Sequence, residues 1–337
     1  MMEQPEHPQR KQIQIGAFLK WLYWRYVRVW FSLLSPGTVN RLTKLAARLQ
    51  LALAGKRSQI MLEELELSSL TKERDTQSLL LNAFQNQLNS WIKQCYLRKC
   101  NGKTIDKYIP VEGLAHLDGA LRQGRGAILL NPHFGPYMMI MPALGYRGYK
   151  VNQLAIQAES PRVARAGFTL LANKARYEAV EKTMPIKFIN AGTETFDNFG
   201  LRNMAIRDVL SALRKNEIVL YPPTGRGGRQ WQSALFLGRT ANFNPVPYKL
   251  ALKEGVPLLP VFLLDISESG NSESVARLVI EPPIEISAVD TPEGLLIKYI
   301  MILTAYVQRY PEHFAFFQFD MRLKSQWDDH PFFARTN

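Results

Sequence analysis

The sequence predicts an α/β fold in which a mostly parallel central sheet is flanked by helices, with an amphipathic helical region at the N-terminus. From Val111 onward, short apolar segments alternate with longer segments of helical pattern, which is typical of parallel strands joined by crossover helices. Residues 12–98 have the pattern of helices instead. The 337 residues, 46% of them hydrophobic, are enough for one large α/β domain with an N-terminal extension or for two modest domains.

The N-terminal part is predicted to contain three helices, over residues 12–34, about 38–54 and about 58–98. Pro36-Gly37 separates the first two, and Gly55 separates the last two, because proline and glycine interrupt helices. The third helix carries mixed charge along its first half, so we expect it to be solvated.

The remaining elements alternate along the chain. The predicted strands cover residues 127–130, 150–156, 186–189, 218–221, 258–264 and 276–280. The predicted helices cover residues 161–175, 201–214, 244–254 and 292–309, the last followed by an aromatic segment at 313–319. This pattern divides the chain into a basic aromatic docking region (1–57), a helical connector (58–110), the α/β domain (111–325) and a C-terminal tail (326–337).

The N-terminal region is both basic and aromatic. Six aromatic residues fall within residues 21–31, and no acidic residue occurs between Glu6 and Glu63. Aromatic rings favour the headgroup level of a membrane, and each nearby Lys or Arg contributes about 1 kcal/mol at an anionic surface. We therefore predict that residues 1–57 dock on anionic lipid. The alternative is a helix packed on the protein's own core with a solvated basic face.

Three further features limit the class of protein. Lys20, Arg25 and Arg28 interrupt the apolar stretch near the N-terminus, so no membrane-spanning helix is predicted there. Cys95 and Cys100 are the only cysteines and are predicted to be reduced thiols of a cytosolic protein. The formal net charge of +13 favours acidic partners, but no nucleic-acid-binding pattern is present, so we expect no nucleic acid as partner.

The turn after the first predicted core strand carries the strongest chemical signal. His133 follows the strand at 127–130 and is followed by Phe134 and Gly135. Ligands of open α/β sheets bind beyond the carboxyl ends of the strands. A histidine at this position is suited to act as a general base, and the glycine would let a ligand approach the backbone closely.

A second strand end is glycine-rich and cationic. The strand at 218–221 leads into Pro222-Pro223-Thr224-Gly225, and Arg226 and Arg229 follow. Guanidinium groups are suited to hold phosphate or carboxylate, although the spacing of a nucleotide phosphate loop is absent. The alternative is a surface loop with two solvated arginines.

Taken together, these segments resemble the bacterial lipid A biosynthesis acyltransferases, which are the lauroyl and myristoyl transferases within the lysophospholipid acyltransferase superfamily. The resemblance covers roughly residues 110–320 in order and spacing. The segments that carry it are GRGAILL at 124–130, HFG at 133–135, LGY at 144–146, FLGRTA at 236–241, LALKEGVPLLPVF at 250–262 and YPEHF at 310–314.

The resemblance implies a fatty acyl transfer to a lipid hydroxyl or amine, with acyl carrier protein or acyl-CoA as donor and no metal or cofactor. It implies His133 as the base. The implied substrate contacts are Phe134, Gly135, Tyr137, Met138, Arg226, Arg229 and Arg239. It also implies a peripheral or monotopic protein on the cytoplasmic face of the bacterial inner membrane.

The family pattern is HxxxxD or HxxxxE, and here its acidic position is Met138. The second family block, at Pro222-Pro223-Thr224-Gly225-Arg226, also lacks its acidic residue. Losing the carboxylate that orients a histidine base costs about 10⁴ in rate in the serine-protease template. The family motif of this chain is therefore degenerate.

Three interpretations follow from this degenerate motif. In the first, an active acyltransferase uses a carboxylate from elsewhere, with Glu159, Glu194 and Asp197 as candidates. In the second, a less assisted histidine transfers a different acyl-type group to an amine or hydroxyl. In the third, the chain is a catalytically silent relative that binds lipid or a partner enzyme.

Overall fold

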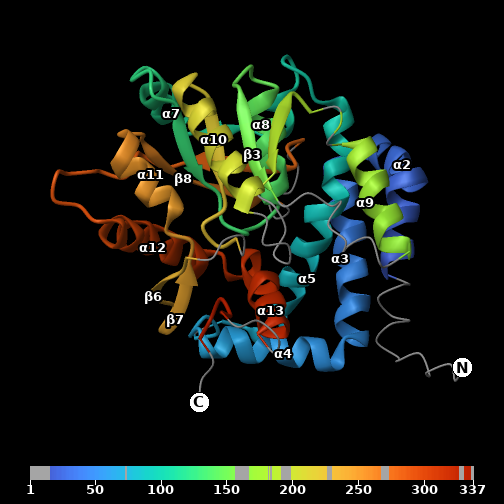
Figure 1. Cartoon of the computed structure of the whole chain (residues 1–337). Helices are drawn as coiled ribbons and strands as arrows, with labels where there is room; N and C mark the ends of the chain where they lie inside the picture. The colour runs from blue at the N-terminus through green and yellow to red at the C-terminus, as the bar shows by residue number, and fades with distance from the viewer. Residues whose placement is uncertain are drawn as a thin grey trace, which may run out of the picture.

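A computed structural model describes residues 16–72, 74–155, 167–180, 182, 184–190, 199–225, 230–266, 273–325 and 330–334. Within these residues the chain forms a helix-rich α/β sandwich around a seven-stranded sheet (Figure 1). The strands are β1 (Val111–Glu112), β2 (Ala127–Leu130), β3 (Val151–Ala155), β4 (Ile186–Asn190), β5 (Ile218–Tyr221), β8 (Leu258–Asp265) and β9 (Ala276–Ile280).

The strand order is β1-β9-β8-β2-β5-β3-β4, and every neighbouring pair is parallel except the antiparallel pair β8–β9. All four residues of β2 and of β5 are buried, as expected of central parallel strands with helices on both faces. The fold class is therefore confirmed. The six predicted strands lie within one residue of the observed bounds.

Alternate strand residues face two separate apolar layers. Ile128 and Leu130 pack in one layer with α10 (Phe199–Arg214), α11 (Val246–Glu254) and α12 (Pro292–Arg309). Ala127 and Leu129 pack in the other layer. The helices on that second face include η2 (Lys93–Lys99), α6 (Ile105–Tyr108), α7 (Leu114–Leu121), α8 (Ile140–Gly145) and α9 (Gly167–Ala179).

A two-stranded hairpin, β6 (Gln232–Phe236) and β7 (Arg239–Phe243), was not among the predicted elements. Its two-residue turn is Leu237-Gly238, with φ of 52° and 74°. A turn with two positive φ values usually carries Asn-Gly or Asp-Gly. The sequence Leu-Gly is not typical of such a turn, so the hairpin was not predicted from the sequence.

The N-terminal helices wrap around one side of the sheet (Figure 1). Residues 16–33 are helical, with a π-helical turn, η1 (Tyr23–Val27), before α2 (Arg28–Leu33). The next helix, α3 (Pro36–Leu53), is capped by the side chain of Ser35. Among the described residues, none of the helices combines the length and the hydropathy needed to span a bilayer.

The predicted single helix over 58–98 is wrong. The structure has α4 (Gly55–Leu67), α5 (Thr76–Ile92) and η2 in its place. Asp75 begins α5 by accepting hydrogen bonds from two backbone N–H groups of its first turn, which ends any continuation from α4. The predicted solvation holds for most charged side chains in the first half of this segment, which are exposed at Glu63, Glu66, Lys72, Arg74 and Asp75. Glu64 and Lys93 are buried instead, because Glu64 pairs with Arg239 and Lys93 with Asp265.

The other predicted helices are close to the observed ones. The helix predicted at 161–175 is displaced, since α9 continues to Ala179; residues 161–166 lie outside the described part. The aromatic segment 313–319 forms the end of η5 (Pro311–His313) and the first half of α13 (Ala315–Lys324). Cys95 and Cys100 are free and buried.

Candidate functional site

His133 and Thr224 are brought together by the register of two parallel strands. Leu130 at the end of β2 is paired with Tyr221 at the end of β5. His133 and Thr224 each lie three residues beyond this pair, at the same edge of the sheet. Because both residues follow paired strand ends by the same number of residues, their side chains lie close together beyond the carboxyl edge of the sheet.

Thr224 holds the histidine by two contacts. The backbone N–H of His133 donates to Thr224 Oγ1 at 3.1 Å, and His133 Nδ1 lies 2.7 Å from the same oxygen. Thr224 is 1% exposed, so this hydroxyl is fixed in the protein interior. With Nδ1 protonated and donating to Thr224, Nε2 carries the lone pair. Among the described residues, Nε2 has no hydrogen-bond partner.

Aromatic rings enclose the imidazole. Phe317 of α13 stacks on it with a centroid distance of 5.3 Å and an interplanar angle of 13°. Tyr137 meets it edge-on at 5.0 Å. Burial, and to a lesser extent the Lys324 ammonium, lower the pKa of His133 to about 4. The imidazole is therefore neutral at pH 7 and able to accept a proton.

Met138, at the motif's acidic position, is partly buried and packs against the apolar core. It lies in the 3₁₀ turn η3 (Tyr137–Met139) and packs against the layer that contains Leu129. Among the described residues, no carboxylate hydrogen-bonds to His133, and Thr224 takes the position of an orienting partner. The predicted replacement carboxylates Glu159, Glu194 and Asp197 lie outside the described residues, as do Arg226 and Arg229.

Phe134 and Gly135 face the protein rather than an open site. Phe134 is 1% exposed and its ring stacks on His313 at 5.1 Å. Gly135 has φ +58°, and a Cβ there would lie 2.3 Å from the carbonyl oxygen of Leu263 and 2.7 Å from His313 Cδ2. Tight packing of the chain on itself is a sufficient reason for glycine at this position.

Arg239 is engaged in an ion pair away from the His133 turn. Its guanidinium donates to Glu64 Oε2 at 2.7 Å and stacks over Phe333, with Cζ 4.0 Å from the ring centroid. Glu64 is 1% exposed, so the ion pair ties β7 to α4 in the interior. A role of Arg239 in holding phosphate stays a prediction.

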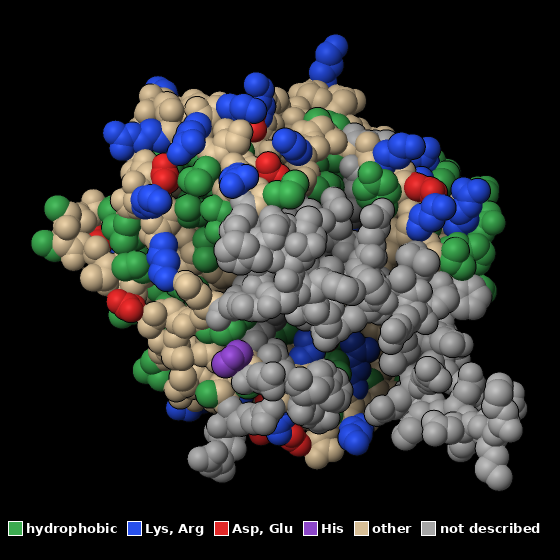
Figure 2. Space-filling view, in the orientation of Figure 1, with side chains coloured by type: hydrophobic (Ala, Val, Ile, Leu, Met, Phe, Trp, Pro, Cys, Tyr) green, Lys and Arg blue, Asp and Glu red, His purple; other side chains and the backbone are tan. Residues whose placement is uncertain are grey.

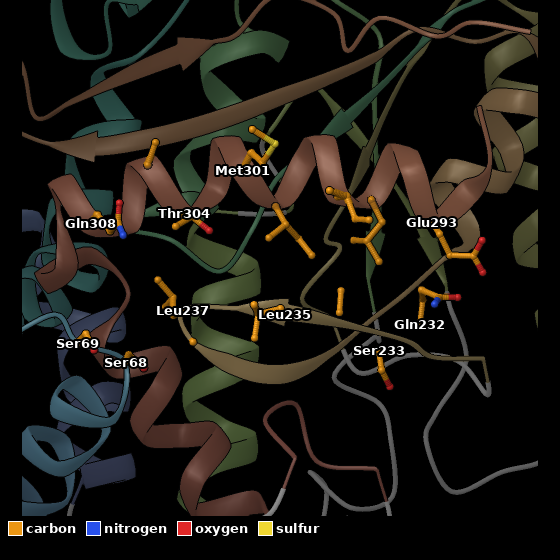
Figure 3. A pocket seen from close by; sticks show the side chains of 16 residues that line it. Ser68, Ser69, Gln232, Ser233, Leu235, Leu237, Glu293, Met301, Thr304 and Gln308 are labelled. Atoms are coloured by element: carbon orange, nitrogen blue, oxygen red, sulfur yellow. The ribbon is translucent and has the colours of Figure 1, made fainter. Parts of the chain in front are cut away.

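An apolar groove of about 820 Å³ lies elsewhere, between the β6–β7 hairpin and α12 (Figure 3). Leu235 of the hairpin and Met301 of α12 line this groove and are 73% and 68% exposed. The volume of this groove lies in the range of small-molecule binding sites, which by itself would favour it as the functional site. Its walls include neither His133 nor Thr224, and Glu293 is its sole titratable side chain among the described residues, so the chemistry favours the His133 turn.

Sequence reasoning found His133 but missed Thr224 and Phe317 as its partners. The signal for Thr224 is its spacing, since it follows the strand at 218–221 by the same three residues as His133 follows the strand at 127–130. Phe317 has no comparable signal, because its contact with His133 joins segments far apart in the chain.

Comparison with protein families gives one match. The family model described as "Bacterial lipid A biosynthesis acyltransferase" matches residues 9–324. Among curated proteins, no sequence matches this chain. The family match covers the N-terminal helices as well as the sheet and α13, so it includes every described residue of the His133 site.

Proposed function

Because the chain belongs to the bacterial lipid A biosynthesis acyltransferase family, we propose that it transfers a fatty acyl or related acyl group to a hydroxyl or amine of a lipid, with His133 as the base. The supporting observation is the His133–Thr224 pair. It leaves Nε2 open while Nδ1 is held at 2.7 Å from the threonine hydroxyl. Acyl carrier protein or acyl-CoA would supply the acyl group as a thioester.

The proposed reaction needs one base and no metal. The acceptor oxygen or nitrogen attacks the thioester carbonyl while His133 Nε2 takes its proton. The carbon–sulfur bond breaks as the carbonyl re-forms, and the imidazolium returns the proton to the leaving thiolate. Thr224 Oγ1 accepts from Nδ1–H throughout and so keeps Nε2 directed at the acceptor.

A threonine is a weaker partner than a carboxylate. Its hydroxyl fixes the tautomer and the ring, but it has no negative charge to stabilise the imidazolium. With a pKa of about 4, His133 is also a weak base. We therefore expect proton removal to accompany formation of the bond to carbon, when the acceptor proton has become more acidic.

The test of the catalytic assignment is His133→Ala, assayed with acyl carrier protein and CoA thioesters against a panel of lipid acceptors. Product formation should be abolished with little change in thermal stability. Activity that survives in this variant would show that the base lies elsewhere.

The alternative, a catalytically silent homologue that binds lipid or a partner enzyme, is favoured by the missing carboxylate and the low pKa of His133. Met138→Glu separates the two. A large gain of activity over an inactive wild type would indicate a silenced enzyme. A loss from an active wild type would indicate a site that uses Thr224 instead.

We also propose that the N-terminal helices dock on anionic lipid at the cytoplasmic face of the inner membrane, where both types of donor are found. One stripe of α3 is apolar and exposed, at Leu42, Leu45, Leu49 and Leu53. Arg41, Lys44 and Arg48 are exposed between these leucines. Trp30 is 72% exposed on α2, whereas Trp24 is 2% exposed and belongs to the core.

Docking is best tested by point substitutions, because residues 1–57 also contribute buried side chains to the core. Deleting residues 1–57 would also remove Trp24, Val39 and Ala47 from the core. Leu45→Glu combined with Leu49→Glu changes the exposed stripe alone and should abolish flotation with phosphatidylglycerol liposomes. A matched control, Val289→Glu with Ile297→Glu, alters exposed apolar residues elsewhere. Unchanged flotation of the α3 variant would end the docking proposal.

A further inference from the structure

One face of α13 carries both the phenylalanine that contacts His133 and two charged side chains further along the helix. Phe317 stacks on the His133 ring. Asp320 and Lys324 follow at spacings of three and four residues, so they lie on the same face of the helix. At 1.5 Å per residue they are about 4.5 and 10 Å further along the axis than Phe317.

Two more cations reach this face from the N-terminal helices. The Arg57 guanidinium of α4 lies over two rings of α13, with Cζ 4.8 Å from the Phe316 centroid and 5.1 Å from that of Phe319. Lys20 Nζ lies 4.5 Å from the ring of Trp91 on α5. Asp320 interacts electrostatically with Lys20, Arg57 and Lys324. We call these four side chains the α13 charge cluster.

Three side chains of the α13 charge cluster are exposed to solvent, and two of these are partly desolvated at the same time. The side chains of Lys20, Asp320 and Lys324 are exposed, yet surrounding protein lowers the pKa of Lys20 and raises that of Asp320, because desolvation disfavours the charged forms. Exposure together with desolvation is expected of groups that line a concave surface. Lys and Arg side chains are visible in a hollow near α13 and α4 (Figure 2).

The cations outnumber their internal partners. Three cations face one carboxylate, which leaves a net charge of +2 on the α13 charge cluster. Among the described residues, none of the three forms an ion pair within 4.0 Å. Like charges held together in a concave site repel one another, so an added dianion would be stabilised there.

We propose that the α13 charge cluster binds a phosphate group of the substrate, with Lys20, Arg57 and Lys324 as its contacts. This rests on the proposed function for the identity of the substrate, but the phosphate site itself does not require turnover. The phosphate is carried either by the acyl donor or by the lipid acceptor. Asp320 sets the charge of the site and opposes binding, and it is not a substitute for the missing motif acid.

The first experiment measures binding of inorganic pyrophosphate to the full-length His133→Ala variant, by calorimetry at low ionic strength. Lys324→Ala and Lys20→Ala in that background should each weaken binding roughly fivefold to tenfold. Both side chains are exposed, so neither substitution should unfold the protein. Lys56→Ala, next to Arg57 on an exposed position of α4, is the matched control and should leave binding unchanged.

Asp320→Asn provides a prediction of opposite sign. Removing the carboxylate should tighten pyrophosphate binding by about the same factor. Unchanged binding in Lys20→Ala and Lys324→Ala, or weaker binding in Asp320→Asn, would overturn the proposal. Because His133 is already replaced, this result is independent of whether the protein transfers acyl groups.

The second experiment identifies the source of the phosphate in the active wild-type background. If the donor carries it, Lys324→Ala raises KM for the acyl thioester about tenfold and leaves KM for the lipid unchanged. If the acceptor carries the phosphate, Lys324→Ala raises KM for the lipid about tenfold and leaves KM for the acyl thioester unchanged. A variant with both KM values unchanged would contradict a substrate phosphate at this site.

Discussion

The molecule contains two histidines at the carboxyl edge of the sheet, and they differ in what each nitrogen does. His313 has the carboxylate partner that His133 lacks, since Glu312 Oε1 lies 3.0 Å from its Nδ1. Its Nε2, however, accepts a hydrogen bond from the backbone N–H of Asp265 at 2.9 Å. His133 has a hydroxyl at Nδ1 and an open Nε2. Both rings stack on a phenylalanine.

The comparison teaches that a histidine–carboxylate pair does not by itself make a base. The lone pair of His313 is used to satisfy a backbone donor, so this residue fixes the last residue of β8. At His133 the partner is weaker but the lone pair is available. His133 is therefore the better candidate for a base because its Nε2 is unpaired among the described residues, even though the partner of its Nδ1 is uncharged and that of His313 is a carboxylate.

Gly135→Ala should produce the largest effect, because Gly135 joins the two histidine turns. Its N–H donates to the carbonyl oxygen of His313 at 2.9 Å, and an added Cβ would overlap the backbone of Leu263. We expect the free energy of unfolding to fall by more than about 4 kcal/mol. Urea denaturation checks this, and a loss below about 1 kcal/mol would mean that the two turns are not rigidly joined.

His313→Ala should reduce stability by about 2–3 kcal/mol, because it removes the acceptor of the part-buried Asp265 N–H and the ring that stacks on Phe134. His133→Ala also removes a ring from a phenylalanine but should cost less than His313→Ala in the same urea assay, since its Nε2 satisfies no backbone donor among the described residues. The comparison fails if the two substitutions destabilise the protein equally.

Thr224→Val should lower kcat about 10- to 100-fold, because the isosteric side chain no longer holds Nδ1. Thr224→Ser keeps the hydroxyl and should retain most activity. Steady-state kinetics on the folded variants distinguish them. Equal activity of the valine and serine variants would show that Thr224 has no orienting role.

The smallest effect concerns pH. Because burial lowers the pKa of His133 to about 4, the neutral base persists on acidification, and kcat/KM should fall only as pH approaches 4 rather than 6.5. The stability contribution has the matching sign: between pH 6.5 and 4 the unfolded state binds the proton more strongly, so stability declines as pH falls. An acid limb near 6.5 would contradict a buried, carboxylate-free histidine.

The sheet was predictable because its central strands are buried on both faces and read as continuous apolar segments. Helix breaks in the N-terminal part were harder, since the cap at Asp75 is set by local hydrogen bonds that compete with an otherwise helical pattern. At the site, His133 could be predicted from its place after β2. Its contact with Thr224 depends on strand register, and its contact with Phe317 depends on how α13 returns to the sheet.

The return of α13 has a consequence for how the protein is made. The His133 ring receives its stacking partner from α13, which follows every strand of the sheet in the chain. Strand β2 itself lies between β5 and β8, which are synthesised long after it. Contacts between such distant segments form slowly and late in folding. During translation the histidine therefore stays uncovered until α13 has emerged, and a product truncated before α13 would build the sheet without closing the site.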